Sequence, residues 1–184
     1  MKDFRLVCAF HSTVDYMTPD RPVAMAYAFS DWDQEIGDDA HPDAQNLKLA
    51  NKTVSKGSLL YFAVIDTAKY PAGTTPPEVT AITIKCTKAN SDVGDSPFVA
   101  DPRGHNGWWI NKTSLTARPG ASDSAPVSKS QGYVANVACN VIGRVWEMGP
   151  FTAFKEGGYE FTVTVELSNG RQFEVDPEMV VGDG

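Results

Sequence analysis

Residues 159–181 read YEFTVTVELSNGRQFEVDPEMVV, and this stretch decides the fold class of the chain. Its first half places an apolar residue at every second position, with Glu or Thr in between. A period of two is typical of a β-strand with one buried face, since successive side chains point to opposite sides of a sheet. The apolar positions of this predicted strand are Tyr159, Phe161, Val163, Val165 and Leu167.

The residues after this strand predict a hairpin and its register. A two-residue Asn-Gly loop would place apolar residues opposite polar ones. A three-residue loop, residues 168–170 with Gly170 in the left-handed conformation, keeps the two faces apart. It pairs Val165 with Phe173 and Val163 with Val175, and it avoids setting two glutamates directly opposite each other. The second strand should then end or lie at a sheet edge at Pro177, because proline cannot donate to a strand ladder.

The composition is that of an ordinary soluble domain. The chain has 184 residues, of which 42% are hydrophobic and 21% are charged, and its formal net charge is −7. This length suits one domain with a sizeable core, so we expect a single β-sandwich domain over residues 1–184. The acidic balance provides no basic surface for nucleic acid or for an anionic membrane, so neither is expected as a partner.

The apolar run near the N-terminus and the cysteines bear on location. The run covers only residues 6–10, which is too short for a signal peptide or a membrane span. Cys8, Cys86 and Cys139 lie far apart in apolar, strand-like runs, and an odd number cannot all pair internally. We expect reduced thiols in the core and therefore a cytoplasmic protein.

Further stretches show strand patterns, and none shows a long amphipathic helix. Residues 58–65 are apolar at nearly every position, which predicts a central strand covered on both faces. With polar, Gly- and Pro-containing segments between the runs, the pattern predicts an all-β, antiparallel β-sandwich, immunoglobulin-like or jelly-roll-like, of roughly eight to ten strands with long polar loops. The other runs cover residues 6–10, 23–29, 47–50, 78–87, 108–110 and 133–141.

Residues 23–29, VAMAYAF, alternate large apolar residues with Ala24, Ala26 and Ala28. A helix is the rival assignment because alanine favours helices, but Val, Tyr and Phe on a period of two favour a strand. One face of that strand would be bulky and the other small enough for close approach by a second sheet, a loop or another subunit. The three alanines are therefore a candidate self-association surface.

The acidic stretch that follows is a candidate calcium site. Alternate carboxylates at Asp31, Asp33 and Glu35 could converge on one hard cation. The stretch departs from the EF-hand loop, because its glycine comes one place late and Pro42 stands where the bidentate glutamate should be. A solvated acidic loop is the alternative, and calcium is the cofactor that this loop could hold.

A second candidate site combines aromatic rings with polar side chains near position 105. An exposed loop with these residues could stack on a sugar ring. The alternative is that the aromatic residues open a short strand and anchor the core. The candidate residues are Arg103, His105, Asn106, Trp108 and Trp109.

The sequence contains no nucleophile elbow, phosphate loop, dinucleotide fingerprint or HExxH motif. His11, His41 and His105 fall in separate polar segments. We therefore expect a protein that is not an enzyme. A cleft that gathers two of these histidines with carboxylates would support an enzyme instead.

The order of the predicted strands, the Val-Ser-Lys-Gly-Ser turn region at residues 54–58, and the ending Phe-Glu-Val-Asp-Pro at residues 173–177 resemble bacterial inclusion-body proteins of the PixA/AidA type. The small DP-EP bacterial family has a comparable ending. The resemblance implies a cytoplasmic β-sandwich protein that accumulates and self-associates, without catalytic residues. We therefore expect a non-enzymatic homo-oligomer, with carbohydrate binding, assisted or not by calcium, as the alternative.

Overall fold

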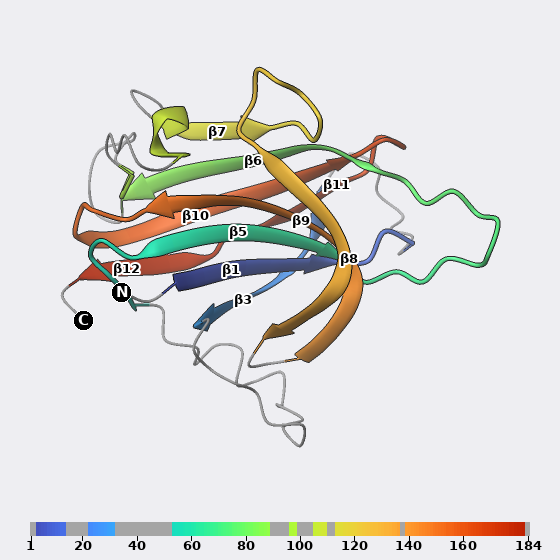
Figure 1. Ribbon diagram of the computed structural model, residues 1–184, viewed down its shortest axis with the longest axis horizontal. Helices are drawn as coiled ribbons and strands as arrows, with labels where there is room; N and C mark the ends of the chain where they lie inside the picture. The colour runs from blue at the N-terminus through green and yellow to red at the C-terminus, as the bar shows by residue number, and fades with distance from the viewer. Residues whose placement is uncertain are drawn as a thin grey trace.

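The computed structural model describes residues 3–13, 22–31, 53–88, 96–98, 105–109, 113–136 and 139–182. Over these residues the chain forms two packed β-sheets, with one short 3₁₀ helix, η2 (His105–Trp109), outside them (Figure 1). The predicted all-β sandwich is confirmed. No helix among the described residues is long and apolar enough to cross a membrane.

The first sheet has the strand order β3-β1-β5-β9-β8. The central strand β5 runs parallel to β1 and antiparallel to β9, and its last five residues are all buried. This confirms the central strand that the apolar run predicted. The bounds are β1 (Asp3–Phe10), β3 (Ala26–Asp31), β5 (Leu59–Asp66), β8 (Val127–Asn136) and β9 (Cys139–Thr152).

The second sheet is built around β10. One side of β10 pairs with β6, which pairs in turn with β7. The other side pairs with β11 and β12, which lie beside the short strands β2 and β4. The bounds are β2 (Val23–Ala24), β4 (Thr53–Ser55), β6 (Val79–Lys88), β7 (Ser114–Ala117), β10 (Gly157–Leu167), β11 (Gln172–Val175) and β12 (Glu178–Gly182).

The hairpin of β10 and β11 has the predicted register. Val165 lies opposite Phe173 and Val163 opposite Val175. Gly170 closes the turn with a φ of 84°, a conformation that glycine adopts without steric cost. Proline interrupts the second strand as expected, because β11 ends at Val175 and β12 starts after Pro177.

The main core fills the space between the two sheets. The inward residues of β1, β5 and β9 meet those of β6 and β10, and aromatic rings contact one another at its centre. Phe62 packs edge-on against Phe98, Phe151 and Phe161, with ring centroids 5.5 to 6.1 Å apart. Ile82, Ile84 and Cys86, at every second position of β6, all point inward.

Two expectations about the strands were wrong. The sheets are mixed rather than purely antiparallel, because β1–β5, β2–β11 and β4–β12 are parallel pairs, and the described residues form twelve strands. The single strand expected over residues 133–141 is divided between β8 and β9, which pair antiparallel with Asn136 opposite Cys139. An alternation of apolar residues shows which residues share a face of a sheet. It does not show where one strand ends, because both arms of a hairpin can continue the same alternation.

A second, smaller core lies on the outer face of the first sheet. It consists of Val7, Ala63, Ile65 and Val145, all at most 4% exposed. Figure 1 shows β8 curving across the ends of β5 and β1, and β8 contacts β3 although the two strands lie at opposite ends of the sheet order. The hairpin of β8 and β9 therefore folds back over its own sheet.

Cys8 and Cys86 are both buried, as expected of core thiols, and Cys8 is free. Burial raises the pKa of Cys8 from 9.0 to about 12, because the thiolate would lose its hydration inside the core. Cys8 therefore stays protonated and unreactive at neutral pH.

Gly143 allows β9 to turn over β5. A Cβ atom at this position would lie 2.2 Å from the backbone oxygen of Asp66. We predict that Gly143→Ala lowers the free energy of unfolding by about 1–3 kcal/mol, because the two strands must separate to admit the methyl group. Gly107→Ala is the control, since a Cβ atom there meets nothing within 4 Å. Guanidinium denaturation compares the two variants, and equal stabilities would contradict the role given to Gly143.

Candidate functional site

The predicted sugar-binding stretch is mostly part of the fold. Asn106 is fully buried, and its side-chain amide donates to the Thr152 carbonyl and accepts from the Thr152 N–H at 2.9 and 2.8 Å. Trp109 is 2% exposed and packs on Phe98 and Phe151. These residues form η2 rather than the start of a strand, because the Asn106 side chain takes the place of a strand partner for β9.

The remaining residues of this stretch are less buried. His105 and Trp108 on η2 are both half-buried, and the His105 ring lies edge-on to Phe151. Arg103 lies outside the described residues. The structure therefore leaves His105 and Trp108 as the described members of this set that reach the surface.

The predicted calcium loop lies largely outside the described residues. Asp31 is the last residue of β3, where its backbone pairs with Phe4, and Asp33 and Glu35 are not described. Within the described ranges, no group of three or more His, Cys, Asp or Glu residues could hold a metal ion.

The three alanines do not lie in one strand, which corrects the expectation of a single small face. Ala24 belongs to β2 in the second sheet, opposite Glu174. Ala26 and Ala28 belong to β3 in the first sheet, opposite Ala9 and Val7. The chain passes between the layers at the intervening Met25, which is buried and donates its backbone N–H to the Glu174 carbonyl.

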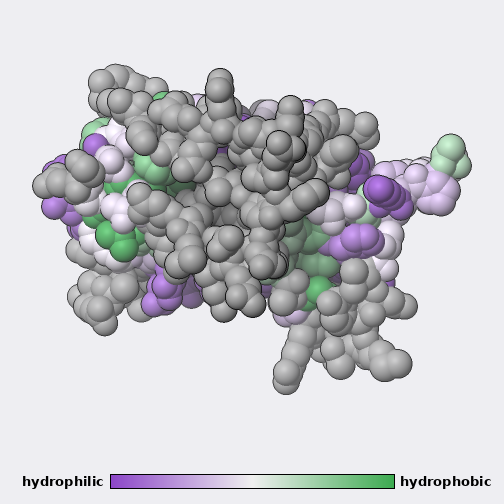
Figure 2. All heavy atoms as spheres, turned by 90° about the horizontal axis from the view of Figure 1, so that it is seen from below, coloured by the Kyte–Doolittle hydropathy of each residue, from purple (hydrophilic) through white to green (hydrophobic). Residues whose placement is uncertain are grey.

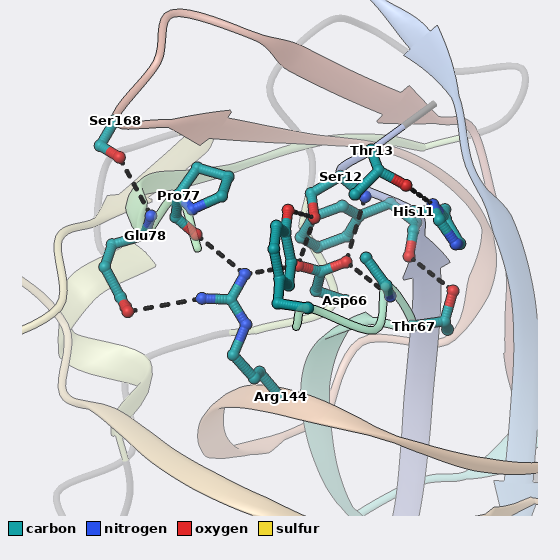
Figure 3. Close-up of polar contacts among 12 residues, drawn as sticks. His11, Ser12, Thr13, Asp66, Thr67, Pro77, Glu78, Arg144 and Ser168 are labelled. Carbon is teal, nitrogen blue, oxygen red and sulfur yellow. Dashed lines mark hydrogen bonds and ion pairs between the residues drawn. The ribbon is translucent and has the colours of Figure 1, made fainter. Parts of the chain in front are cut away.

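The most elaborate polar cluster of the described residues surrounds Asp66, at one end of the main core (Figure 3). Asp66 is fully buried at the end of β5, and its Oδ2 accepts from Arg144 Nη2 on β9 at 2.5 Å. Ser12 donates both its hydroxyl and its backbone N–H to this carboxylate, and Ala68 donates its backbone N–H. The charge is therefore paired with an arginine and solvated by hydrogen bonds, as a buried carboxylate requires.

Arg144 also joins the two ends of the loop between β5 and β6. Its guanidinium donates to Asp66 where the loop begins and to the Pro77 carbonyl, at 2.8 Å, where the loop ends. The same group lies 5.6 Å from the centre of the Tyr70 ring and 5.2 Å from that of Trp146, within the range of cation–π attraction. Arg144 therefore holds the two ends of this loop together.

The cluster has the residue types of an active site, but its geometry is that of a structural centre. Both oxygens of Asp66 already accept two hydrogen bonds each, so this carboxylate has no lone pair left for a substrate proton. Among the described residues, no histidine hydrogen-bonds to Ser12. His11 accepts or donates toward Thr13 at 2.8 Å, and Figure 3 shows its ring directed away from Asp66.

The sheet edges are the second group of features that could carry a function. Edge strands expose unpaired backbone groups, and proteins protect them with charges, prolines or short length. β8 carries the exposed Lys129, and β2 and β4 have two and three residues. β3 and β7 have neither lysine nor proline, and no strand of the described residues pairs with their outer sides.

Comparisons with known proteins add little. No family model matches the chain, and no curated protein matches it. Among solved structures, the chain is similar to Astrotactin-2, described as a conserved vertebrate-specific and perforin-like membrane protein involved in neuronal development. The identity is 14% and the TM-score 0.35, over 79% of this chain and 25% of that chain. A likeness this distant has no bearing on function.

We predict that Asp66→Asn lowers the free energy of unfolding by about 3 kcal/mol, because it removes the buried counter-ion of Arg144 and leaves that charge with the half-exposed Glu78 at 3.4 Å. Glu156→Gln is the matched control. It removes a carboxylate from the exposed ion pair with Lys56, in which both side chains are 50% exposed, and should cost less than about 1 kcal/mol. Adding Arg144→Met to Asp66→Asn should restore part of the loss. Urea denaturation measures all three, and equal effects of the two single substitutions would contradict the structural role.

Proposed function

We propose that this chain is a non-enzymatic β-sandwich protein that functions by associating with further copies of itself. The resemblance to bacterial inclusion-body proteins supports a cytoplasmic protein that accumulates. The buried, free thiol of Cys8 fits a reducing compartment.

The observation that carries the proposal is the outer side of β3, with which no strand among the described residues pairs, although β8 contacts β3. On its other side this strand pairs with β1. Its sequence is AYAFSD, without lysine or proline and with its single charge, Asp31, at the last position. Edge strands of this length are templates for pairing with another chain, since their outward N–H and C=O groups need partners. In the view from below (Figure 2), hydrophobic residues of the described part are visible toward the left of the molecule and right of its centre.

We predict that Ala26→Lys weakens self-association about fivefold or more, because pairing across β3 would bring like charges of two copies together. Ala26 is chosen because its neighbour Ala9 is partly exposed, whereas Val7 beside Ala28 is buried. Ala121→Lys, in the loop between β7 and β8, is the control with the same change of net charge. Sedimentation velocity over a range of concentrations measures the mass.

The mass of the assembly formed by the wild-type protein should increase with concentration. The Ala121→Lys variant should show the same increase. A thermal melt of each variant shows whether the monomer fold is kept. A wild-type protein that stays monomeric at every concentration would contradict the proposed function.

Carbohydrate binding is a second candidate, and the observation that favours it is the anchoring of η2. Asn106 and Trp109 hold this helix against the core, while His105 and Trp108, three positions apart, are only partly buried. A ring held in this way can stack on a sugar without losing much side-chain freedom.

We predict, for this second candidate, that glycan-array binding by the wild-type protein is lost in Trp108→Ala, because the stacking surface is removed. The array is read with and without calcium, which also tests the acidic residues Asp31, Asp33 and Glu35. Absence of binding by the wild-type protein under both conditions would remove this candidate.

A further inference from the structure

We propose that β7 is a second contact between copies, that it pairs with β7 of another molecule about a two-fold axis, and that contacts at β3 and β7 together build open chains of molecules. This inference rests on the proposed self-association and assigns the occupant of the β7 edge. It follows from the hydrogen-bond pattern of β7, its lack of charge and its position in the fold.

The pairing of β6 with β7 fixes which backbone groups of β7 point outward. Cys86 donates its N–H to the Thr113 carbonyl directly opposite, so these two residues form a hydrogen-bonded pair. Hydrogen-bonded and non-hydrogen-bonded pairs alternate along an antiparallel ladder. Leu115 and Ala117 therefore bond to β6, and the N–H and C=O groups of Ser114 and Thr116 point away from it.

Arg118, the residue after β7, follows the same pattern. Arg118 continues the alternation, so its backbone groups also point outward. Ser124 satisfies both of them, since its hydroxyl accepts from the Arg118 N–H at 3.1 Å and donates to the Arg118 carbonyl at 3.0 Å. The chain thus closes its own edge at Arg118, while the outward backbone groups of Ser114 and Thr116 have no partner among the described residues.

The open groups are self-complementary. If Leu115 lies opposite Leu115 of a second copy, Thr116 of each molecule lies opposite Ser114 of the other. Each such pair exchanges two backbone hydrogen bonds, which uses every outward group of the strand. The same face stays buried across the junction, because Leu115 and Ala117 point into the core and Ser114 and Thr116 do not. An isologous contact of this kind is expected between identical strands.

β7 contacts η2, and its own side chains carry no charge that would oppose this approach. β7 reads Ser-Leu-Thr-Ala, without charge, and its register with β6 runs without a bulge. β7 lies at the top of the molecule in Figure 1 and β3 near the bottom, in different sheets. Two separate self-contacts on one molecule allow each copy to bind two others, so the assembly grows beyond a dimer.

The test removes the outward backbone N–H of Thr116. Thr116→Pro removes an N–H that β6 does not use, which an edge strand tolerates. Thr116→Val is the matched control, because it also loses the hydroxyl contact with Thr83 but keeps the N–H. Sedimentation velocity at increasing concentration is run on the wild-type protein, on each variant, and on Ala26→Lys combined with Thr116→Pro, with thermal melts to show that each remains folded.

We expect the wild-type protein and Thr116→Val to grow beyond dimers, Thr116→Pro to stop at dimers, and the combined variant to stay monomeric. If Thr116→Pro grows as the wild-type protein does, the β7 contact is wrong and the proposed self-association stands. If the wild-type protein is monomeric throughout, the proposed function and the β7 contact both fail.

Discussion

The buried carboxylate of Asp66 constrains the rest of the structure. A charge without exposure to water is tolerable only when an opposite charge and hydrogen bonds surround it. Asp66 obtains them from the segment after β1, from the start of the β5–β6 loop and from β9. These three parts of the chain must meet at one point for the fold to form, so the cluster specifies how the first sheet ends.

The same point determines where the outer layer begins. Asp66 pairs with Arg144 in the ladder between β5 and β9, and the neighbouring Gly143 lets the strands approach more closely than any side chain would allow. Gly132 lies opposite Gly143 in the β8–β9 hairpin. Beyond this pair of glycines, the hairpin turns over Val7, Ala63 and Ile65, and gives the first sheet a second buried face. Charge pairing and close backbone approach thus act together at one place.

Local pattern predicted the strands and the β10–β11 register, because alternation and a glycine turn are both encoded within a few residues. It did not predict which sheet a strand joins. Residues 23–29 alternate without interruption, yet Met25 carries the chain from one sheet to the other. The pair Asp66 and Arg144 was missed because 78 positions separate them. The sequence shows only that Asp66 follows the apolar run of residues 58–65. The pairing of β5 with β9 is needed to identify Arg144 as its partner.

The Asp66 cluster and the edge strands β3 and β7 have different parts in the structure. A sandwich, unlike a closed barrel, always leaves strands at its margins. This chain protects the margin selectively: Lys129 lies on β8, and Ser124 satisfies the backbone just beyond β7. Within the described residues, β3 and β7 carry neither lysine nor proline. Because the core and the Asp66 cluster already stabilise the monomer, the proposed pairing at β3 and β7 would use strand sides that no other described strand needs for folding.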